Sequence, residues 1–169
     1  RWAALNHLAM LPVLLPLVTG SLLLLSSRLA AGLRRAVGFA ATLALLPIAL
    51  LLMAQVADGA HVVYSLGGWQ PPFGIVLVAD RLAALMLLLT AIVAIASHLY
   101  AGDGQDTAGP QFQALFQFQL LGINGAFLTG DLFNLFVFFE VLLIAFYTLL
   151  LHGLGPQRVG AAVHVVVLN

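Results

Sequence analysis

Long apolar stretches separated by short polar connectors dominate this chain of 169 residues. Several stretches approach 20 residues, and 20 helical residues at about 1.5 Å each span about 30 Å, the hydrocarbon thickness of a bilayer. We therefore expect an all-α, polytopic membrane helix bundle with five complete transmembrane helices and the start of a sixth. The expected spans are residues 7–26, 33–56, 81–100, 112–128, 132–152 and, incomplete, 156–169.

The longest connector, residues 58–80, has a pattern of its own. Two runs of β-forming residues, Val62–Tyr64 and Ile75–Val78, flank the turn-forming segment Gly67–Pro72. This arrangement is typical of a β-hairpin. We expect a hairpin at the membrane surface between the second and third spans.

Arginine placement predicts the orientation of the spans. The loop after the first span holds Arg28, Arg34 and Arg35, and the loop after the fifth holds Arg158. Because short cytoplasmic loops carry an excess of Arg and Lys, these loops are expected inside. The N-terminus and the hairpin are then expected outside.

Composition supports membrane insertion and excludes several classes of function. The chain is 63% hydrophobic and 7% charged, whereas soluble domains carry about 25% charged residues. A net charge of zero provides no basic surface for nucleic acid. Without cysteine there is no disulfide, thiol nucleophile or thiolate ligand, and no phosphate-binding or redox motif indicates a cofactor. Because residues 161–169 end within a hydrophobic segment, we expect the N-terminal part of a longer protein.

Glu140 is the first candidate for chemistry, because it lies near the middle of the apolar run 132–151. Placing an ionisable group at that depth costs about 2.5–3.5 kcal/mol on insertion scales, so such residues usually serve a function. We interpret Glu140 as a proton or cation relay; the alternative is a buried carboxylate that only supports helix assembly. Its neighbours at helical spacing are Phe136, Val137, Leu143, Ile144 and Tyr147. Only Tyr147 is polar, so a charged partner has to come from another helix.

Four further polar residues have mainly structural interpretations. Asp80 and Asp131 each precede a span, where an aspartate N-cap is favourable; an access gate is the alternative for Asp131. Asn124 and Asn134 lie inside spans, where hydrogen bonds between helices are expected.

The remaining candidates lie in the first, fourth and sixth spans. Pro12 and Pro16 free backbone carbonyls that neighbouring helices have to satisfy. His164 could carry a proton near neutral pH. The glutamines that punctuate the start of the fourth span are expected at an interfacial helix end, or along a hydrated access path; they are Gln111, Gln113, Gln117 and Gln119.

Three segments together resemble a known family. Residues 122–142 (GINGAFLTGDLFNLFVFFEVL), 66–82 (LGGWQPPFGIVLVADRL) and 159–169 (VGAAVHVVVLN) are similar to the D subunit of Mrp-type multisubunit Na⁺/H⁺ antiporters. These proteins are related to the antiporter-like, proton-pumping subunits of respiratory complex I. The resemblance extends over nearly the whole chain.

The resemblance implies a proton-translocating subunit of a Na⁺(K⁺)/H⁺ antiporter, a secondary transporter driven by the proton gradient and not an enzyme. The partners implied are other antiporter subunits, H⁺, Na⁺ or K⁺, and the lipids of a bacterial plasma membrane. In this family a glutamate at the position of Glu140 pairs with a lysine on a later helix, which here would follow Asn169. Two alternatives remain open: a membrane subunit of an NADH–quinone oxidoreductase or hydrogenase, and a purely structural membrane subunit.

Overall fold

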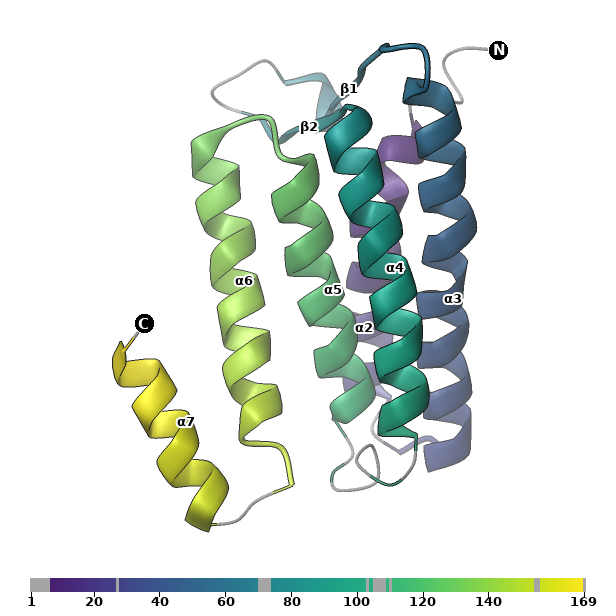
Figure 1. Ribbon diagram of the computed structural model, residues 1–169. Coiled ribbons are helices and arrows are strands. Elements are labelled where there is room, and N and C mark those ends of the chain that lie inside the picture. The colour runs from purple at the N-terminus through teal and green to yellow at the C-terminus, as the bar shows by residue number, and fades with distance from the viewer. Residues whose placement is uncertain are drawn as a thin grey trace.

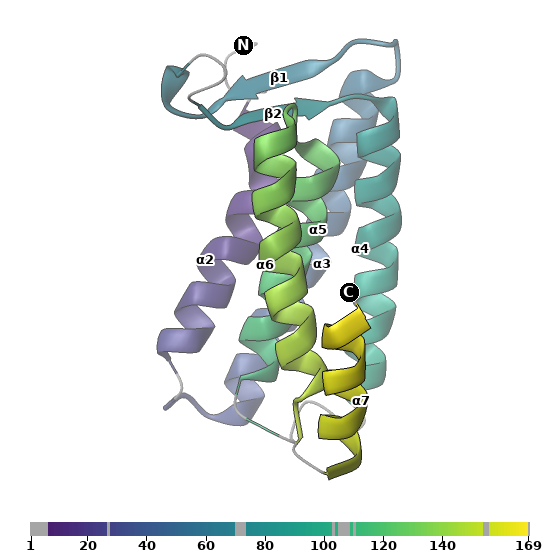
Figure 2. The same cartoon turned by 90° about the vertical axis from the view of Figure 1, so that its left-hand side faces the viewer.

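The computed structural model describes residues 7–26, 28–69, 74–102, 104, 109, 111–153 and 156–168. Long helices stand side by side, and a β-hairpin lies across one end of the bundle (Figures 1 and 2). The helices are η1 (His7–Met10, a 3-10 helix), α2 (Leu11–Leu25), α3 (Ala31–Val56), η2 (Leu66–Gly68, also 3-10), α4 (Arg81–Ala101), α5 (Phe112–Leu128), α6 (Leu132–Leu150) and α7 (Pro156–Leu168). The strands are β1 (Val62–Ser65) and β2 (Val76–Ala79).

The helical segments follow the apolar runs closely, and each observed start lies within two residues of the predicted one; the first span begins at His7 with η1, which runs into α2. Asp80 accepts a hydrogen bond from the backbone nitrogen of Ala83 at 2.7 Å, so the predicted N-cap of α4 is confirmed. At the same corner Arg81 donates to the carbonyl oxygens of Val56 (3.2 Å) and Ala57 (2.6 Å). One arginine thereby satisfies the end of α3 while opening α4.

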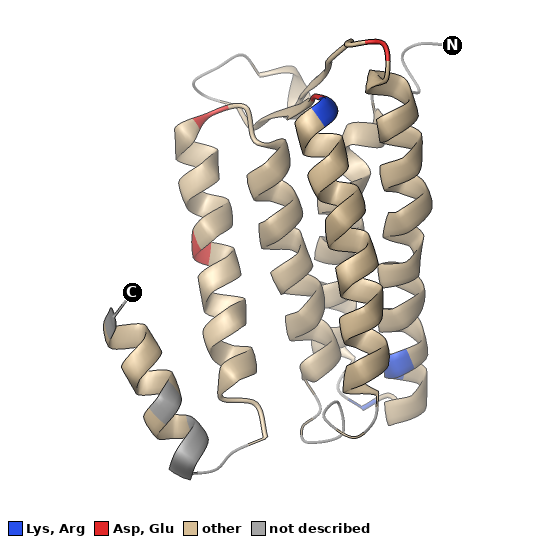
Figure 3. Cartoon of the chain, in the orientation of Figure 1, with Lys and Arg blue, Asp and Glu red and all other residues tan. Residues whose placement is uncertain are grey.

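Four helical segments in the described part of the chain are long and apolar enough to cross a membrane: 7–25, 31–56, 81–101 and 132–150. Their outward faces are apolar, as expected of helices surrounded by lipid or by other helices. Charged residues gather toward the two ends of the bundle, and an acidic position interrupts α6 (Figure 3).

The predicted hairpin is confirmed. β1 and β2 pair antiparallel, with Val62 opposite Ala79 and Ser65 opposite Val76. The second strand begins at Val76, one residue later than predicted, and residues 70–72 of the expected turn lie outside the described residues. The backbone nitrogen of Gly130 donates to the carbonyl oxygen of Val76 at 2.8 Å, so the hairpin also fixes the short connection between α5 and α6.

Helix α5 occupies the centre of the bundle, with α2, α4 and α6 packed around it (Figure 1). Small residues permit close approach: a side chain at Gly20 of α2 would meet the backbone of Ala114 and the side chain of Gln117. The main apolar core lies toward the hairpin end. Its large buried members are Leu52, Val56, Leu77, Leu87, Leu121, Leu128 and Phe138.

A hydrogen bond between α2 and α5 confirms the expectation for the prolines. Pro16 has no N–H, so the carbonyl oxygen of Pro12, four residues earlier, loses its helical donor. The side-chain nitrogen of Asn124 donates to that oxygen at 2.9 Å. Asn124 is buried, and the predicted interhelical role of this residue is confirmed.

Candidate functional site

Helix α6 carries the first candidate and is positioned by its own N-cap. The carboxylate of Asp131 accepts a hydrogen bond from the backbone nitrogen of Asn134 at 2.8 Å, which confirms the capping interpretation. The amide of Asn134 donates to the second carboxylate oxygen of Asp131. The prediction of an interhelical bond for Asn134 is therefore wrong, because three residues after a cap its side chain reaches back to that cap.

The side of α6 that faces α5 is tightly packed. Asn134, Phe138 and Ala145 are buried at intervals of four and seven residues, which places them on one face. Opposite them on α5 are two glycines. An added Cβ at Gly122 would lie 2.8 Å from the backbone of Leu142, and one at Gly125 would collide with the ring of Phe138. The glycines therefore set the distance between the two helices.

Glu140 lies on the other side of α6. It is two residues after Phe138, so at about 100° per residue it points roughly 200° away from the packed face. Its surroundings are large exposed apolar side chains: Phe133 is 73% exposed, Phe136 is 61% and Ile144 is 64%. Within the described part of the chain, no hydrogen bond or ion pair to the carboxylate of Glu140 is present. The structure thus places an acid on an apolar outward face in the middle of a spanning helix.

The other predicted site residues do not gather around Glu140. Asp131 precedes it by nine residues, about 13 Å along the helix axis, and is occupied as the N-cap. Tyr147 follows by seven residues on the same face, about 10 Å away along the axis, half-buried with its ring tilted against Phe146. His164 is exposed on α7, a helix that packs against α6. Only Tyr147 shares the face of Glu140.

A second polar group lies between α3, α4 and α5, and the sequence did not predict that its members meet. Thr42, His98, Gln113 and Gln117 are all buried there. The interfacial interpretation is therefore wrong for Gln113 and Gln117, although it suits the exposed Gln111. The signal was the spacing of four between the two glutamines, which places both on the face of α5 directed into the bundle.

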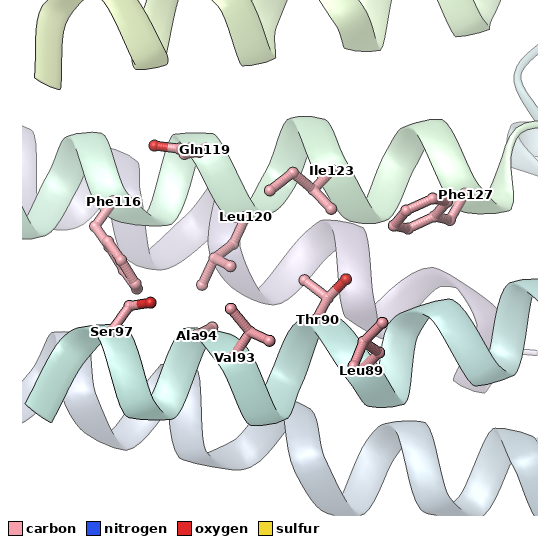
Figure 4. A pocket seen from close by; sticks show the side chains of 10 residues that line it. All are labelled: Leu89, Thr90, Val93, Ala94, Ser97, Phe116, Gln119, Leu120, Ile123 and Phe127. Carbon is pink, nitrogen blue, oxygen red and sulfur yellow. The ribbon is translucent and has the colours of Figure 1, made fainter. Parts of the chain in front are cut away.

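An apolar groove of about 300 Å³ lies between α4 and α5 and is lined by residues of both helices (Figure 4). Leu89, Val93 and Phe127 dominate its lining, with Thr90, Ser97 and Gln119 as polar members. The hydroxyl of Thr90 donates to the carbonyl oxygen of Met86 at 2.8 Å. No lining residue is an acid or a base, so this groove supplies no proton-transfer group.

Comparison with known proteins gives consistent relatives, although no family model matches the chain. The chain is 50% identical over 170 residues to the D subunit of a probable K⁺/H⁺ antiporter of Rhizobium meliloti (strain 1021), covering 98% of this chain and 32% of that protein. It is 40% identical to the D subunit of the Na⁺/H⁺ antiporter of Alkalihalophilus pseudofirmus, covering 97% and 34%. It is 35% identical to the N subunit of the NADH–quinone oxidoreductase of Desulforudis audaxviator, covering 96% and 33%.

Two solved structures resemble the fold. The membrane-bound sulfane sulfur reductase, an archaeal respiratory membrane complex, contains a chain that matches 96% of this one with a TM-score of 0.88 and 30% identity. The Mrp complex from Dietzia sp. DQ12-45-1b matches 88% with a TM-score of 0.75 and 33% identity. The aligned shares of those chains are 34% and 27%. The present chain therefore spans about a third of the length of the relatives that it matches.

Proposed function

Because this chain is homologous to the D subunits of the multisubunit monovalent cation/proton antiporters, of which it spans about a third, we propose that it contributes a proton relay to such an antiporter. The exchange is secondary active transport of Na⁺ or K⁺ against H⁺, driven by the proton gradient. The chain then acts as part of a transporter and not as an enzyme. Its partners are the other subunits of the antiporter.

One observation carries the proposal: Glu140 lies at the middle of α6 on an apolar outward face. A fixed carboxylate there is unfavourable against lipid by about 2.5–3.5 kcal/mol. A carboxylate that serves only assembly would be expected to contact a helix it holds in place. Glu140 instead points away from α5, the helix against which α6 packs most extensively. This geometry favours a group that receives a partner from outside the described bundle.

The relay works by a change of protonation. In general, a cationic side chain stabilises a nearby carboxylate in its charged form, and low-dielectric surroundings without such a cation favour the neutral acid. Alternation between the two states loads and releases one proton. Tyr147 is the secondary polar position on the same face, His164 is a candidate carrier on the adjacent helix, and Asp131 lies at the end of α6.

The proposed setting is a bacterial plasma membrane, with five spans, the 17-residue α5 included, and α7 as the start of a sixth. The loops after α2, α4 and α6 lie at the end opposite the hairpin. Arg28, Arg34 and Arg35 belong to that end, which we assign to the cytoplasm. The hairpin and the N-terminus then lie outside.

A second candidate is a proton-translocating membrane subunit of a redox-driven complex. The match to the N subunit of an NADH–quinone oxidoreductase and the TM-score of 0.88 with a respiratory membrane complex favour it. The two functions differ in energy source. An antiporter acidifies or alkalinises vesicles when Na⁺ or K⁺ is added without an electron donor, whereas a redox-driven pump requires the donor.

The test is cation-induced proton movement in everted vesicles that contain the full-length protein and its complex. We expect Glu140→Gln to lower the exchange rate at least tenfold, with unchanged yield of the assembled complex, because the amide has nearly the same shape but cannot carry a proton. Asp58→Asn makes the same chemical change at an exposed loop position and should retain wild-type exchange. Wild-type exchange by an assembled Glu140→Gln complex would refute the relay.

A further inference from the structure

The buried polar group between α3, α4 and α5 lies near the end of the bundle opposite the hairpin. His98 is in the last turn of α4, Gln113 is in the first turn of α5, and Thr42 is in the first half of α3. The exposed fractions are 0% for Thr42 and Gln117, 3% for His98 and 5% for Gln113. Apolar helix surfaces alone would close this interface, so four polar side chains there require an explanation.

Hydrogen bonds within the group satisfy only part of it. The amide nitrogen of Gln117 donates to the carbonyl oxygen of Gly38 at 2.9 Å and to the hydroxyl of Thr42 at 3.0 Å. The Thr42 hydroxyl donates to the same carbonyl at 2.9 Å. Its one hydrogen is then used, so the Nδ1 atom of His98, 3.4 Å from that hydroxyl, is placed to act as the donor. The polar groups are therefore coupled across three helices.

Three buried polar atoms of the two glutamines have no hydrogen-bond partner: Oε1 of Gln117, and both Oε1 and Nε2 of Gln113. Each orphaned group costs about 1–3 kcal/mol, and folded proteins usually satisfy such groups with ordered water. A buried water typically makes about three hydrogen bonds to polar groups of this kind. Gly38 helps to seat the group, because a Cβ at this position would collide with the amide of Gln113.

We propose that Gln113 and Gln117, with Thr42 and His98, form a hydrated site that binds ordered water between α3, α4 and α5. An excess proton that reaches this water from the nearby end of the bundle, as hydronium, can pass to the imidazole of His98 and leave neutral water and imidazolium. The reverse transfer returns the proton to the water and leaves the imidazole neutral. This is a second proton-exchanging site, because Glu140 faces away from α5 and cannot reach it directly. The transport role of this site rests on the proposed antiporter function, whereas its hydration does not.

Aromatic rings mark the site and provide a reporter. His98 makes edge-to-face contacts with Phe39 at 5.4 Å and with Phe116 at 5.0 Å between ring centroids. Pulsed hydroxyl-radical labelling modifies side chains that touch bulk or ordered water. Phe138, buried between α5 and α6, provides a dry aromatic reference in the same protein.

The experiment labels the full-length protein in lipid nanodiscs and quantifies modified peptides by mass spectrometry. We expect His98 and Phe116 to be labelled at least fivefold more than Phe138. In Gln113→Met/Gln117→Met, which keeps side-chain length and removes the orphaned atoms, this labelling should fall to the level of Phe138. Equal labelling of all three rings in the wild type would overturn the hydrated site, whether or not the variant folds.

Vesicle exchange assays then test the proton role separately. The double methionine variant should lose at least threefold in exchange rate, with unchanged yield of the complex. The role of His98 in exchange would be overturned by the following result: the site is labelled in the wild type, the double methionine variant loses that labelling, and the assembled variant still exchanges ions at the wild-type rate. If Glu140→Gln leaves exchange unchanged while the labelling persists, the relay at Glu140 fails and the hydrated site stands.

Discussion

Helices α5 and α6 are neighbours of similar length and apolar character, yet they use polar residues in opposite ways. On α5, Gln117 and Asn124 point into the bundle and bind groups of α3 and α2. On α6, Glu140 points out of the bundle, among exposed apolar side chains. A polar residue in an apolar helix can thus either hydrogen-bond a group of its own bundle or remain available to a group outside that bundle.

Asn124 shows the first case most clearly: the sequence identifies the carbonyl oxygen that lacks a donor, and the structure identifies Asn124 as its replacement donor. Pro16 deprives the carbonyl oxygen of Pro12 of its donor, and Asn124 supplies a replacement. No comparable deficit in the described residues explains Glu140. The contrast supports a functional role for Glu140 and a structural role for Asn124. It can be tested at the interface between α5 and α6.

The largest expected effect on stability comes from a substitution that disrupts the interface between α5 and α6. In Gly122→Ala the new methyl group would lie 2.8 Å from the backbone nitrogen of Leu142, which cannot rotate away. Overpacking of this kind costs about 1–3 kcal/mol, so we expect a clearly lower midpoint of thermal unfolding for the purified protein in detergent. Gly32→Ala, where an added Cβ meets nothing within 4 Å, is the matched control and should not lower the midpoint. Equal midpoints for both variants would show that α6 is not held where the structure places it.

An intermediate effect tests the inward role of α5. Asn124→Leu leaves the Pro12 carbonyl buried without a donor, and interhelical hydrogen bonds in membranes are worth about 0.6 kcal/mol, at most about 1.7. We expect a loss of about 1 kcal/mol in the free energy of unfolding, within that range. In a Pro16→Ala background the restored N–H satisfies Pro12, so the same Asn124→Leu change should cost less. A double-mutant cycle measures this difference, and purely additive effects would contradict the pairing.

The smallest expected effect concerns Asp131 at the start of α6. It distinguishes a purely capping role of this residue from a role as an access gate. Asparagine caps helices about as well as aspartate, so Asp131→Asn should change the free energy of unfolding by no more than about 0.5 kcal/mol. If Asp131 only caps α6, exchange in vesicles should also stay at the wild-type level. A large loss of exchange with unchanged stability would support the access gate and bring Asp131 into the same route as Glu140.

Much of the fold followed from the sequence, because the periods and lengths involved are local. Apolar runs fixed the helices, aspartates marked the starts of α4 and α6, and the β-forming runs gave the hairpin. The resemblance to the D subunits of cation/proton antiporters is confirmed by relatives at up to 50% identity. The role of Glu140 stays a prediction, since it depends on groups outside the described residues.

The wrong predictions concern which neighbour a polar side chain meets, because this depends on the rotation of each helix about its axis. Asn134 was expected to bind another helix and instead binds Asp131, because the cap is closer. For Gln113 and Gln117 the interfacial helix end is wrong, because both lie inside the bundle; the alternative, a hydrated access path, stays a prediction. Their spacing showed that they share a face, but spacing alone does not reveal which neighbour that face meets.

The sequence by itself determined that this is a membrane protein, where its helices begin, and that one acid interrupts an apolar span. It could do so because bilayer thickness, helix rise and capping act over a few consecutive residues. Only the tertiary structure decided that Asn124 serves Pro12, that the glutamines meet Thr42 and His98, and that Glu140 faces outward. These depend on the rotation and packing of helices far apart in the chain, which small residues such as Gly122 set through contacts that no local pattern encodes.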